Sequence, residues 1–286
     1  MSQFPEEPPD EAAAERDRFA EEASRLLESG EAEEALDLLR RGSRLAARQR
    51  DEAAVAEFAL LEGMALSDLG RAGEALPRLD AALEAMPDDL DALLERGFAL
   101  HELCRFDEAR AQLLDVLRRS PDEAWAHHLL GLIAERRGDA REAERRFARA
   151  RKLDPEEYTA PVELTEASFD AAVEDALASL PPAIQAYLSN VAIAVEDLPS
   201  DDDLLDSDPP LSPSILGVFR GAPLGDKASP DPWSHFPSSI VLYQRNLERC
   251  ASDRNELIEQ IGVTLLHEVG HFLGLDEEAL RERGLE

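Results

Sequence analysis

The sequence has little of what several common classes of protein require. Aromatic residues make up 5% of the chain, and the two cysteines, Cys104 and Cys250, lie far apart. Two isolated cysteines cannot form the disulfide framework of a small secreted fold, so we expect both to be free thiols. No segment approaches the roughly 18 apolar residues that a membrane-spanning helix needs, so no membrane partner is expected.

Basic residues are also scarce. The chain has 30 Lys and Arg against 62 Asp and Glu, which leaves a formal net charge of -32. Nucleic-acid binding requires Lys and Arg to displace counterions from phosphates, so the imbalance argues against a nucleic-acid partner. Solubility alone is the favoured reason for the acidity, and attraction of basic partners is the alternative. No basic segment followed by an apolar run is present near the N-terminus, which predicts no signal peptide and a cytoplasmic location.

The abundant residues are Ala, Leu, Glu and Arg, arranged with helical periodicity over residues 14–160. The preceding residues 1–13, rich in Pro and Glu, are expected to be disordered. Small residues recur where two antiparallel helices must approach closely, and prolines recur where the second helix of a pair ends. The columns share a period of 34 residues: Gly63, Gly97 and Gly131; Ala75, Ala109 and Ala143; Leu79, Leu113 and Phe147; Ala82, Val116 and Ala150; Pro87, Pro121 and Pro155.

This period and this pattern of small residues resemble those of the tetratricopeptide repeat. The resemblance implies an α-helical repeat array, a solenoid in which pairs of helices stack on one another. An earlier, diverged unit fits around Ala23, Gly30, Ala35 and Leu39. Such arrays present a concave surface that commonly binds peptides or proteins, so we expect a protein or peptide partner or substrate in the repeat groove.

The composition changes after Pro155, and residues 163–286 have the mixed pattern of a small α+β domain. An amphipathic helix is predicted over residues 169–188, broken at Pro181 and Pro182. Short strands are predicted over residues 191–195, 215–219 and 240–243, and the last long helix over residues 255–272. The acidic stretch 196–213 lacks the pattern of a calcium-binding loop and is expected to be a solvated loop.

The last long helix contains the pattern His-Glu-x-x-His at His267, Glu268 and His271. Residues four apart lie on one face of a helix, so both imidazoles can point at one ion. The carboxylate of Glu268 can reach a water molecule beside that ion, take its proton and return the proton to a leaving amine. Because imidazole binds zinc well, the pattern predicts a Zn2+ site with Glu268 as general base.

Residues 163–286 resemble the minimal zincin-like metallopeptidases of bacteria. The matching features are the predicted strands around residues 191–195 and 240–243, the stretch 216–221, and residues 266–277 around the zinc motif. The resemblance implies a small α+β zincin-like domain that binds zinc through His267 and His271 and uses Glu268 in catalysis. No methionine follows the motif, which excludes the families that have a Met-turn there.

A third ligand is needed, because catalytic zinc sites usually have three protein ligands. Gly274 can take the left-handed conformation that ends a helix, and carboxylates follow it. Glu277 stands where the extended motif has its third ligand, and we predict that it binds the metal. Asp276 is the alternative, although its short side chain is better suited to cap the closing helix.

Two functions from different classes remain open at this point. The first is a zinc-dependent metallopeptidase whose repeat arm recruits a protein or peptide. The second is a protein-binding scaffold in which the zincin-like domain is structural or inactive, because no residue is a secure oxyanion stabiliser. Arg220 and Tyr243 are the candidates by polarity, and His235 could contact substrate, although a role outside the chemistry is favoured for all three. The sequence predicts neither the cleavage preference nor the oligomeric state.

Overall fold

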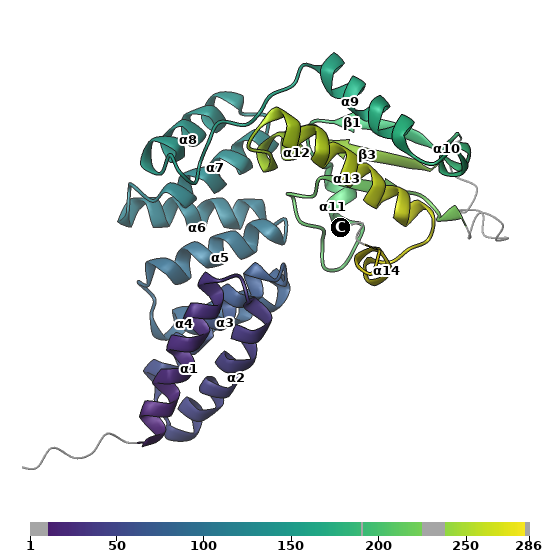
Figure 1. Cartoon of the computed structure of the whole chain (residues 1–286). Helices are drawn as coiled ribbons and strands as arrows, with labels where there is room; N and C mark the ends of the chain where they lie inside the picture. Colours follow the sequence, from purple (N-terminus) through teal and green to yellow (C-terminus); the bar gives the residue numbers. More distant parts are fainter. Residues whose placement is uncertain (1–10, 190, 225–237, 284–286) are drawn as a thin grey trace, which may run out of the picture. The chain divides into compact units, whose positions relative to one another are not determined.

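The computed structural model describes residues 11–189, 191–224 and 238–283 of the 286-residue chain. The chain forms two compact units, Met1–Tyr158 and Thr159–Glu286 (Figure 1). As the sequence predicts, the first unit is an array of helix pairs and the second is a small domain with a three-stranded sheet. Among the described residues, no helix has the length and the apolar character needed to span a membrane.

The first unit is built from consecutive pairs of helices, and the two helices of each pair contact each other along their length. The helices are α1 (Glu11–Glu28), α2 (Ala32–Gln49), α3 (Glu52–Asp68), α4 (Ala72–Ala85), α5 (Leu90–Glu102), α6 (Phe106–Arg119), α7 (Ala124–Arg136) and α8 (Ala140–Leu153). The expected disorder over residues 1–13 is wrong for residues 11–13, which belong to α1. Glu and Ala favour helix, and packing on α2 stabilises it. Residues 1–10 lie outside the described part of the chain.

The repeated glycines mark where the two helices of a pair approach most closely. A Cβ atom built on Gly63 would lie 2.5 Å from Cδ2 of Leu79, and one built on Gly131 would lie 2.5 Å from Cε1 of Phe147. The large residue of the second helix thus occupies the space that glycine leaves on the first. This close packing is the physical reason for the recurring columns in the sequence.

The first helices of the pairs also form a layer of their own. Helix α1 contacts α3, α3 contacts α5, and α5 contacts α7. Among the described residues, contacts between neighbouring second helices are sparse or absent. The first helices therefore line the inner, more tightly curved side of the array.

The second unit is built around three short strands. Strand β3 is central and pairs in parallel with β1 and antiparallel with β2, which leaves β2 at an edge of the sheet. The elements are α9 (Glu166–Ser179), α10 (Pro182–Leu188), β1 (Ala192–Glu196), α11 (Asp201–Leu205), β2 (Gly217–Arg220), β3 (Ser239–Tyr243), α12 (Gln244–Cys250), α13 (Arg254–Phe272) and α14 (Glu277–Arg281).

Helix α13 is the long helix that carries the zinc motif. It begins at Asp253, whose side chain accepts hydrogen bonds from two backbone N–H groups of the first turn. One face of α13 is apolar and packs on β2, β3 and α9. The buried positions of this face recur every four residues: Leu257, Ile261, Leu265 and Val269.

The acidic stretch 196–213 is only in part the solvated loop that the sequence predicts, although most of its acidic side chains are exposed. It contains α11, which begins with a capping box: Ser200 and Asp203 each accept a hydrogen bond from the other's backbone N–H. The side chain of Asp203 is only 6% exposed and pairs with Arg220 of β2. The available signal was the Ser-x-x-Asp spacing, which is typical of the start of a helix.

Candidate metal centre

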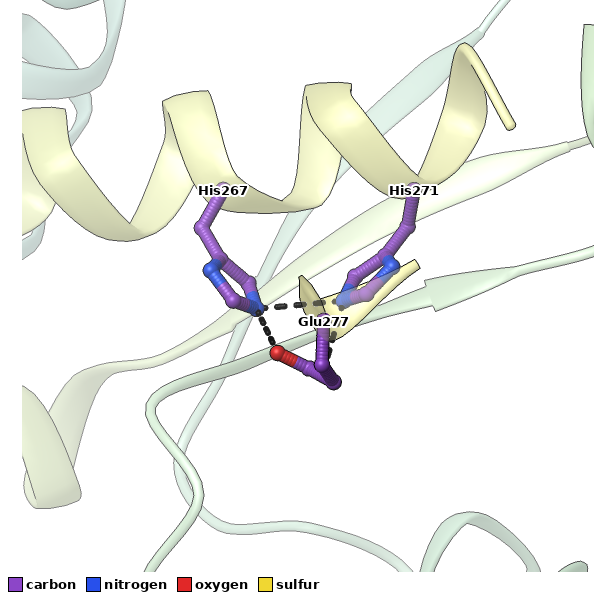
Figure 2. A group of neighbouring side chains, drawn as sticks. All are labelled: His267, His271 and Glu277. Carbon is purple, nitrogen blue, oxygen red and sulfur yellow. Dashed lines mark hydrogen bonds and ion pairs between the residues drawn. The ribbon is translucent and has the colours of Figure 1, made fainter. Parts of the chain in front are cut away.

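Three side chains from two elements converge beside the C-terminal half of α13. His267 and His271 project from successive turns of α13, and the carboxylate of Glu277, at the start of α14, faces both (Figure 2). The two Nε2 atoms lie 3.1 Å apart. The carboxylate oxygens of Glu277 lie 3.2 Å from Nε2 of His271 and 3.8 Å from Nε2 of His267. The structure thus brings the three predicted ligands together.

The spacing of these atoms fits a single zinc ion. With bonds of about 2.0–2.1 Å in a tetrahedral site, two ligand atoms stand about 3.3 Å apart. The ligand atoms of His267, His271 and Glu277 all lie within 4.8 Å of one another, so one ion can contact all three. Two imidazoles and one carboxylate form a donor set that zinc takes in catalytic sites, where a fourth position stays open for water.

A tight turn brings Glu277 back to α13. Gly274 has a φ of 88°, in the left-handed region that favours glycine. The N–H of Leu275 donates to the carbonyl oxygen of Gly270, 3.0 Å away, and closes the helix end. Leu280 of α14 then packs on Gly270 so closely that a Cβ atom there would overlap it. This docking of α14 holds Glu277 against the two histidines.

Asp276, the alternative third ligand, makes a different interaction. It is the N-cap of α14, and its carboxylate accepts a hydrogen bond from the backbone N–H of Ala279, 2.9 Å away. Its carboxylate is not part of the converging group of ligand atoms among the described residues. The geometry therefore favours Glu277 as the ligand and Asp276 as the cap.

A contact that the sequence analysis missed orients His271. Its Nδ1 atom lies 3.1 Å from the carbonyl oxygen of Leu275. A carbonyl oxygen can only accept a hydrogen bond, so Nδ1 carries the proton and Nε2 presents its lone pair towards the other ligands. No side-chain pattern signals this contact, because its acceptor belongs to the backbone.

Glu268 lines the same cavity as the three ligands and is 5% exposed. Its carboxylate accepts a hydrogen bond from the backbone N–H of Phe219 in β2. Burial raises the pKa of Glu268 to about 7, against the opposing effects of His267 and of the Phe219 hydrogen bond. A carboxyl group with a pKa near neutrality can both accept and return a proton.

Strand β2 approaches α13 closely because Gly217 has no side chain. A Cβ atom built on Gly217 would lie 2.9 Å from Cγ2 of Thr264 and 3.1 Å from Cγ of Glu268. The close approach lets Phe219, two residues further along the strand, reach the carboxylate of Glu268. The sequence analysis included Gly217 in the stretch 216–221 but missed this role, although an isolated glycine in a strand often marks such an approach.

The converging side chains open into a cavity of about 660 Å³. Strand β2 and the segment before it form one wall, and α13 with the turn before α14 forms the other. Most of the lining is apolar, and Gln260 and Thr264 supply polar groups beyond the acidic and histidine side chains. A cavity of this size and polarity is suited to a small ligand or to a few residues of a peptide.

The two polar residues considered as oxyanion stabilisers do not face the metal centre. Arg220 donates hydrogen bonds to Glu196 at 2.9 and 3.0 Å and to Asp203 at 2.6 and 2.7 Å. Tyr243 is buried, and burial together with the charge of Asp203 raises its pKa. Neither Arg220 nor Tyr243 is among the described residues that line the cavity. His235, the possible substrate contact, lies outside the described residues.

Comparison with known families matches both parts of the chain. The zincin-like metallopeptidase family matches residues 188–285, which include α13, α14 and all three strands. The tetratricopeptide repeat family matches residues 66–133. The chain therefore combines a tetratricopeptide-repeat region with a C-terminal zincin-like metallopeptidase domain, as the sequence predicts. No curated protein matches the chain.

Solved structures similar to this chain include repeat proteins. A double mutant of MamA RS-1 is 27% identical, with a TM-score of 0.41, over 49% of this chain and 76% of that one. MamA from Desulfovibrio magneticus RS-1 is 26% identical, with a TM-score of 0.42 and the same shares. YrrB, described as a TPR protein with an unusual peptide-binding site, is 19% identical, with a TM-score of 0.34, over 48% of this chain and 86% of that one.

Proposed function

We propose that this protein is a cytoplasmic zinc-dependent metallopeptidase that hydrolyses peptide bonds and recruits a protein or peptide through its repeat unit. One observation carries the proposal. The ligand atoms of His267, His271 and Glu277 converge at zinc-like spacing, and Glu268 lines the same cavity. A purely structural metal site does not need a carboxylate with a pKa near neutrality beside it.

Zinc, when bound by His267, His271 and Glu277, supplies a Lewis acid that polarises the scissile carbonyl and acidifies water. The chain's own residues carry out the proton transfers. Glu268 accepts the proton of the attacking water and delivers it to the leaving amine. The Phe219 N–H holds the Glu268 carboxylate in place between these two transfers.

The edge strand β2 is suited to orient an extended peptide. The carbonyl oxygen of Leu216 accepts a hydrogen bond from the N–H of Tyr243 in β3. Because backbone groups alternate along a strand, those of Gly217 and Phe219 turn away from β3. Both residues line the cavity. The Phe219 N–H is engaged with Glu268, so a peptide can pair with the backbone groups of Gly217 and with the carbonyl oxygen of Phe219 and present its own carbonyl to the metal site.

One observation favours a second candidate function, a protein-binding scaffold whose zincin-like domain is structural or inactive. The cavity lacks a Tyr, Arg, Lys or Asn among the described lining residues, and such groups commonly stabilise a developing oxyanion. Gln260 is the remaining uncharged amide in the lining. The scaffold predicts zinc binding without cleavage.

The two functions are separated by measuring zinc content and peptide cleavage on the same purified protein. We expect about one zinc per chain and cleavage of a peptide library, with Glu268→Gln keeping the metal. The rate should fall by a factor of about 100 to 10,000 in this variant, the usual contribution of a general base. Glu278→Gln, an equal change of charge at an exposed residue of α14, is the control. Cleavage that persists unchanged in Glu268→Gln contradicts the catalytic assignment, and zinc without any cleavage supports the scaffold.

A further inference from the structure

Helix α5 of the repeat unit carries a buried carboxylate that has no counter-charge. Glu95 is 9% exposed, and among the described residues no Lys, Arg or His lies within ion-pair distance of it. Glu62 of α3, the other buried glutamate among the described residues of the array, has a cationic partner: it is 2% exposed and lies 3.3 Å from Nε of Arg78. Glu95 has no such partner. This is unusual, because burying a charge without a partner is unfavourable.

The surroundings of Glu95 add further negative charge beside its carboxylate. Asp91 lies one turn earlier on α5, and Asp68 lies at the end of α3. Burial, followed by the charges of Asp68 and Asp91, raises the pKa of Glu95 to about 7. The hydroxyl of Ser67 lies beside the carboxylate, yet it is buried without a hydrogen bond of regular geometry. We call Ser67, Asp68, Asp91 and Glu95 the acidic patch.

The fold of the array does not require a carboxylate at this position. The residues one repeat before and after Glu95 are Leu61 and Leu129, and Leu129 is 2% exposed in the core. A leucine at position 95 would therefore satisfy the packing that the repeat needs. A buried polar group that costs stability and that the fold does not need is typical of a binding site.

The acidic patch lies on the first-helix layer, next to an aromatic surface. Its residues belong to α3 and α5, which line the inner side of the array. Phe98 follows Glu95 by three residues and so lies on the same face of α5. Its ring stands 5.2 Å from that of Trp125 in α7, and both side chains are half-buried. The acidic patch therefore lies next to an apolar surface formed by the rings of Phe98 and Trp125.

We propose that the acidic patch binds a Lys or Arg side chain of a peptide or protein segment whose neighbouring apolar residue rests on Phe98 and Trp125. A cation supplies the missing partner of Glu95, and its N–H groups can donate to the Asp68 and Asp91 carboxylates and to the Ser67 hydroxyl. Charge also argues against a second copy of this chain as the partner, because each copy carries a net charge of -32. The inference rests on the recruiting role of the repeat unit in the proposed function and specifies the chemistry of the recruited segment.

Fluorescence anisotropy with two labelled dodecapeptides tests the inference. Both have a Gly-Ser background; one contains two Lys-Phe pairs and the other two Glu-Phe pairs. The protein is the full chain with Glu268→Gln, so that the probe is not consumed. We expect the Lys-Phe peptide to bind at pH 8 and the Glu-Phe peptide not to bind. Adding Glu95→Gln should weaken binding about tenfold, as for one lost charge pair.

The matched control is Glu84→Gln, which removes the same charge from an exposed residue of α4, outside the first-helix layer. It should change the affinity less than about twofold, because exposed charges act weakly through solvent. Equal effects of Glu95→Gln and Glu84→Gln, equal binding of the two peptides, or no binding of either would overturn the inference. None of these readouts depends on cleavage, so a failure of the peptidase assignment leaves the result intact.

Discussion

His271 and Leu275 are joined by a hydrogen bond that crosses the end of α13. Nδ1 of His271 donates to the carbonyl oxygen of Leu275, 3.1 Å away, and Leu275 follows the positive-φ residue Gly274. One turn therefore orients a proposed ligand and also returns the chain so that Glu277 can reach it. Zinc affinity should depend on the backbone of this turn as well as on the ligand side chains.

The first prediction concerns the third ligand. Glu277→Ala should lower zinc affinity by about 100-fold or more, since even the loss of an outer contact to a ligand costs about 10- to 100-fold. Asp276→Ala should keep zinc better and lose about 1 kcal/mol of stability, because it removes the cap of α14. Both effects can be measured by competition with a zinc chelator and by thermal unfolding of the full chain. If Asp276→Ala loses the metal while Glu277→Ala keeps it, the assignment is reversed.

The second prediction concerns the turn itself. Gly274→Ala introduces a Cβ at a φ of 88° and should cost about 1–2 kcal/mol of stability. It should also weaken zinc binding, because the turn positions both Leu275 and Glu277. Gly262→Ala in α13 is the control: its Cβ would meet only Ala176, at 4.0 Å, so stability should stay equal or rise by up to about 1 kcal/mol. Equal zinc affinity in the two variants would show that the turn does not control the site.

The third prediction concerns the approach of β2 to α13. Gly217→Ala would place a Cβ 2.9 Å from Thr264 and 3.1 Å from Glu268, an overpacking that should cost about 1–3 kcal/mol. The shifted strand moves Phe219 away from Glu268, so kcat should fall while zinc content stays at the wild-type level. Kinetics and metal analysis of the same preparation check this. Loss of zinc together with activity would indicate a general loss of structure instead.

The fourth prediction concerns Glu95 and pH. Because the pKa of Glu95 in the folded chain is raised to about 7, the folded state keeps a proton that the unfolded state has lost above its ordinary pKa. Stability should therefore decrease as pH rises from 5.5 to 8, by about 2 kcal/mol from this group. Glu95→Gln should lack this decrease, and Glu84→Gln should retain it, as measured by urea unfolding of the full chain. The same slope in all three proteins would contradict the burial of an unpaired carboxylate.

Local patterns explain why much of the fold was predictable. The column of Gly63, Gly97 and Gly131 reflects contacts between helices that are neighbours in the sequence. The period of the array can therefore be recognised from the sequence alone. The pair His267 and His271 is equally local, because one helix fixes their relation. Glu277 is one short turn away. Its position in the extended motif and the suitability of Asp276 as a helix cap were enough to favour Glu277 as the ligand.

Contacts between distant segments explain what was not predictable. The hydrogen bond from Phe219 to Glu268 and the closeness that Gly217 permits join a strand to a helix nearly fifty residues later. A structural role was favoured for Arg220, but only the fold shows that it pairs with Glu196 and Asp203. No pattern within a single segment contains these relations.

The sequence by itself determined the repeat array, the α+β class of the second unit and the zinc motif, because each rests on spacing along one or two adjacent elements. Only the tertiary structure decided which polar groups lie in the cavity, which are engaged elsewhere, and that Glu95 is buried without a counter-charge. The physical reason is that burial and charge pairing depend on which segments pack together. The sequence does not show whether a cation, another carboxylate or solvent lies beside a given glutamate, and these neighbours determine its pKa.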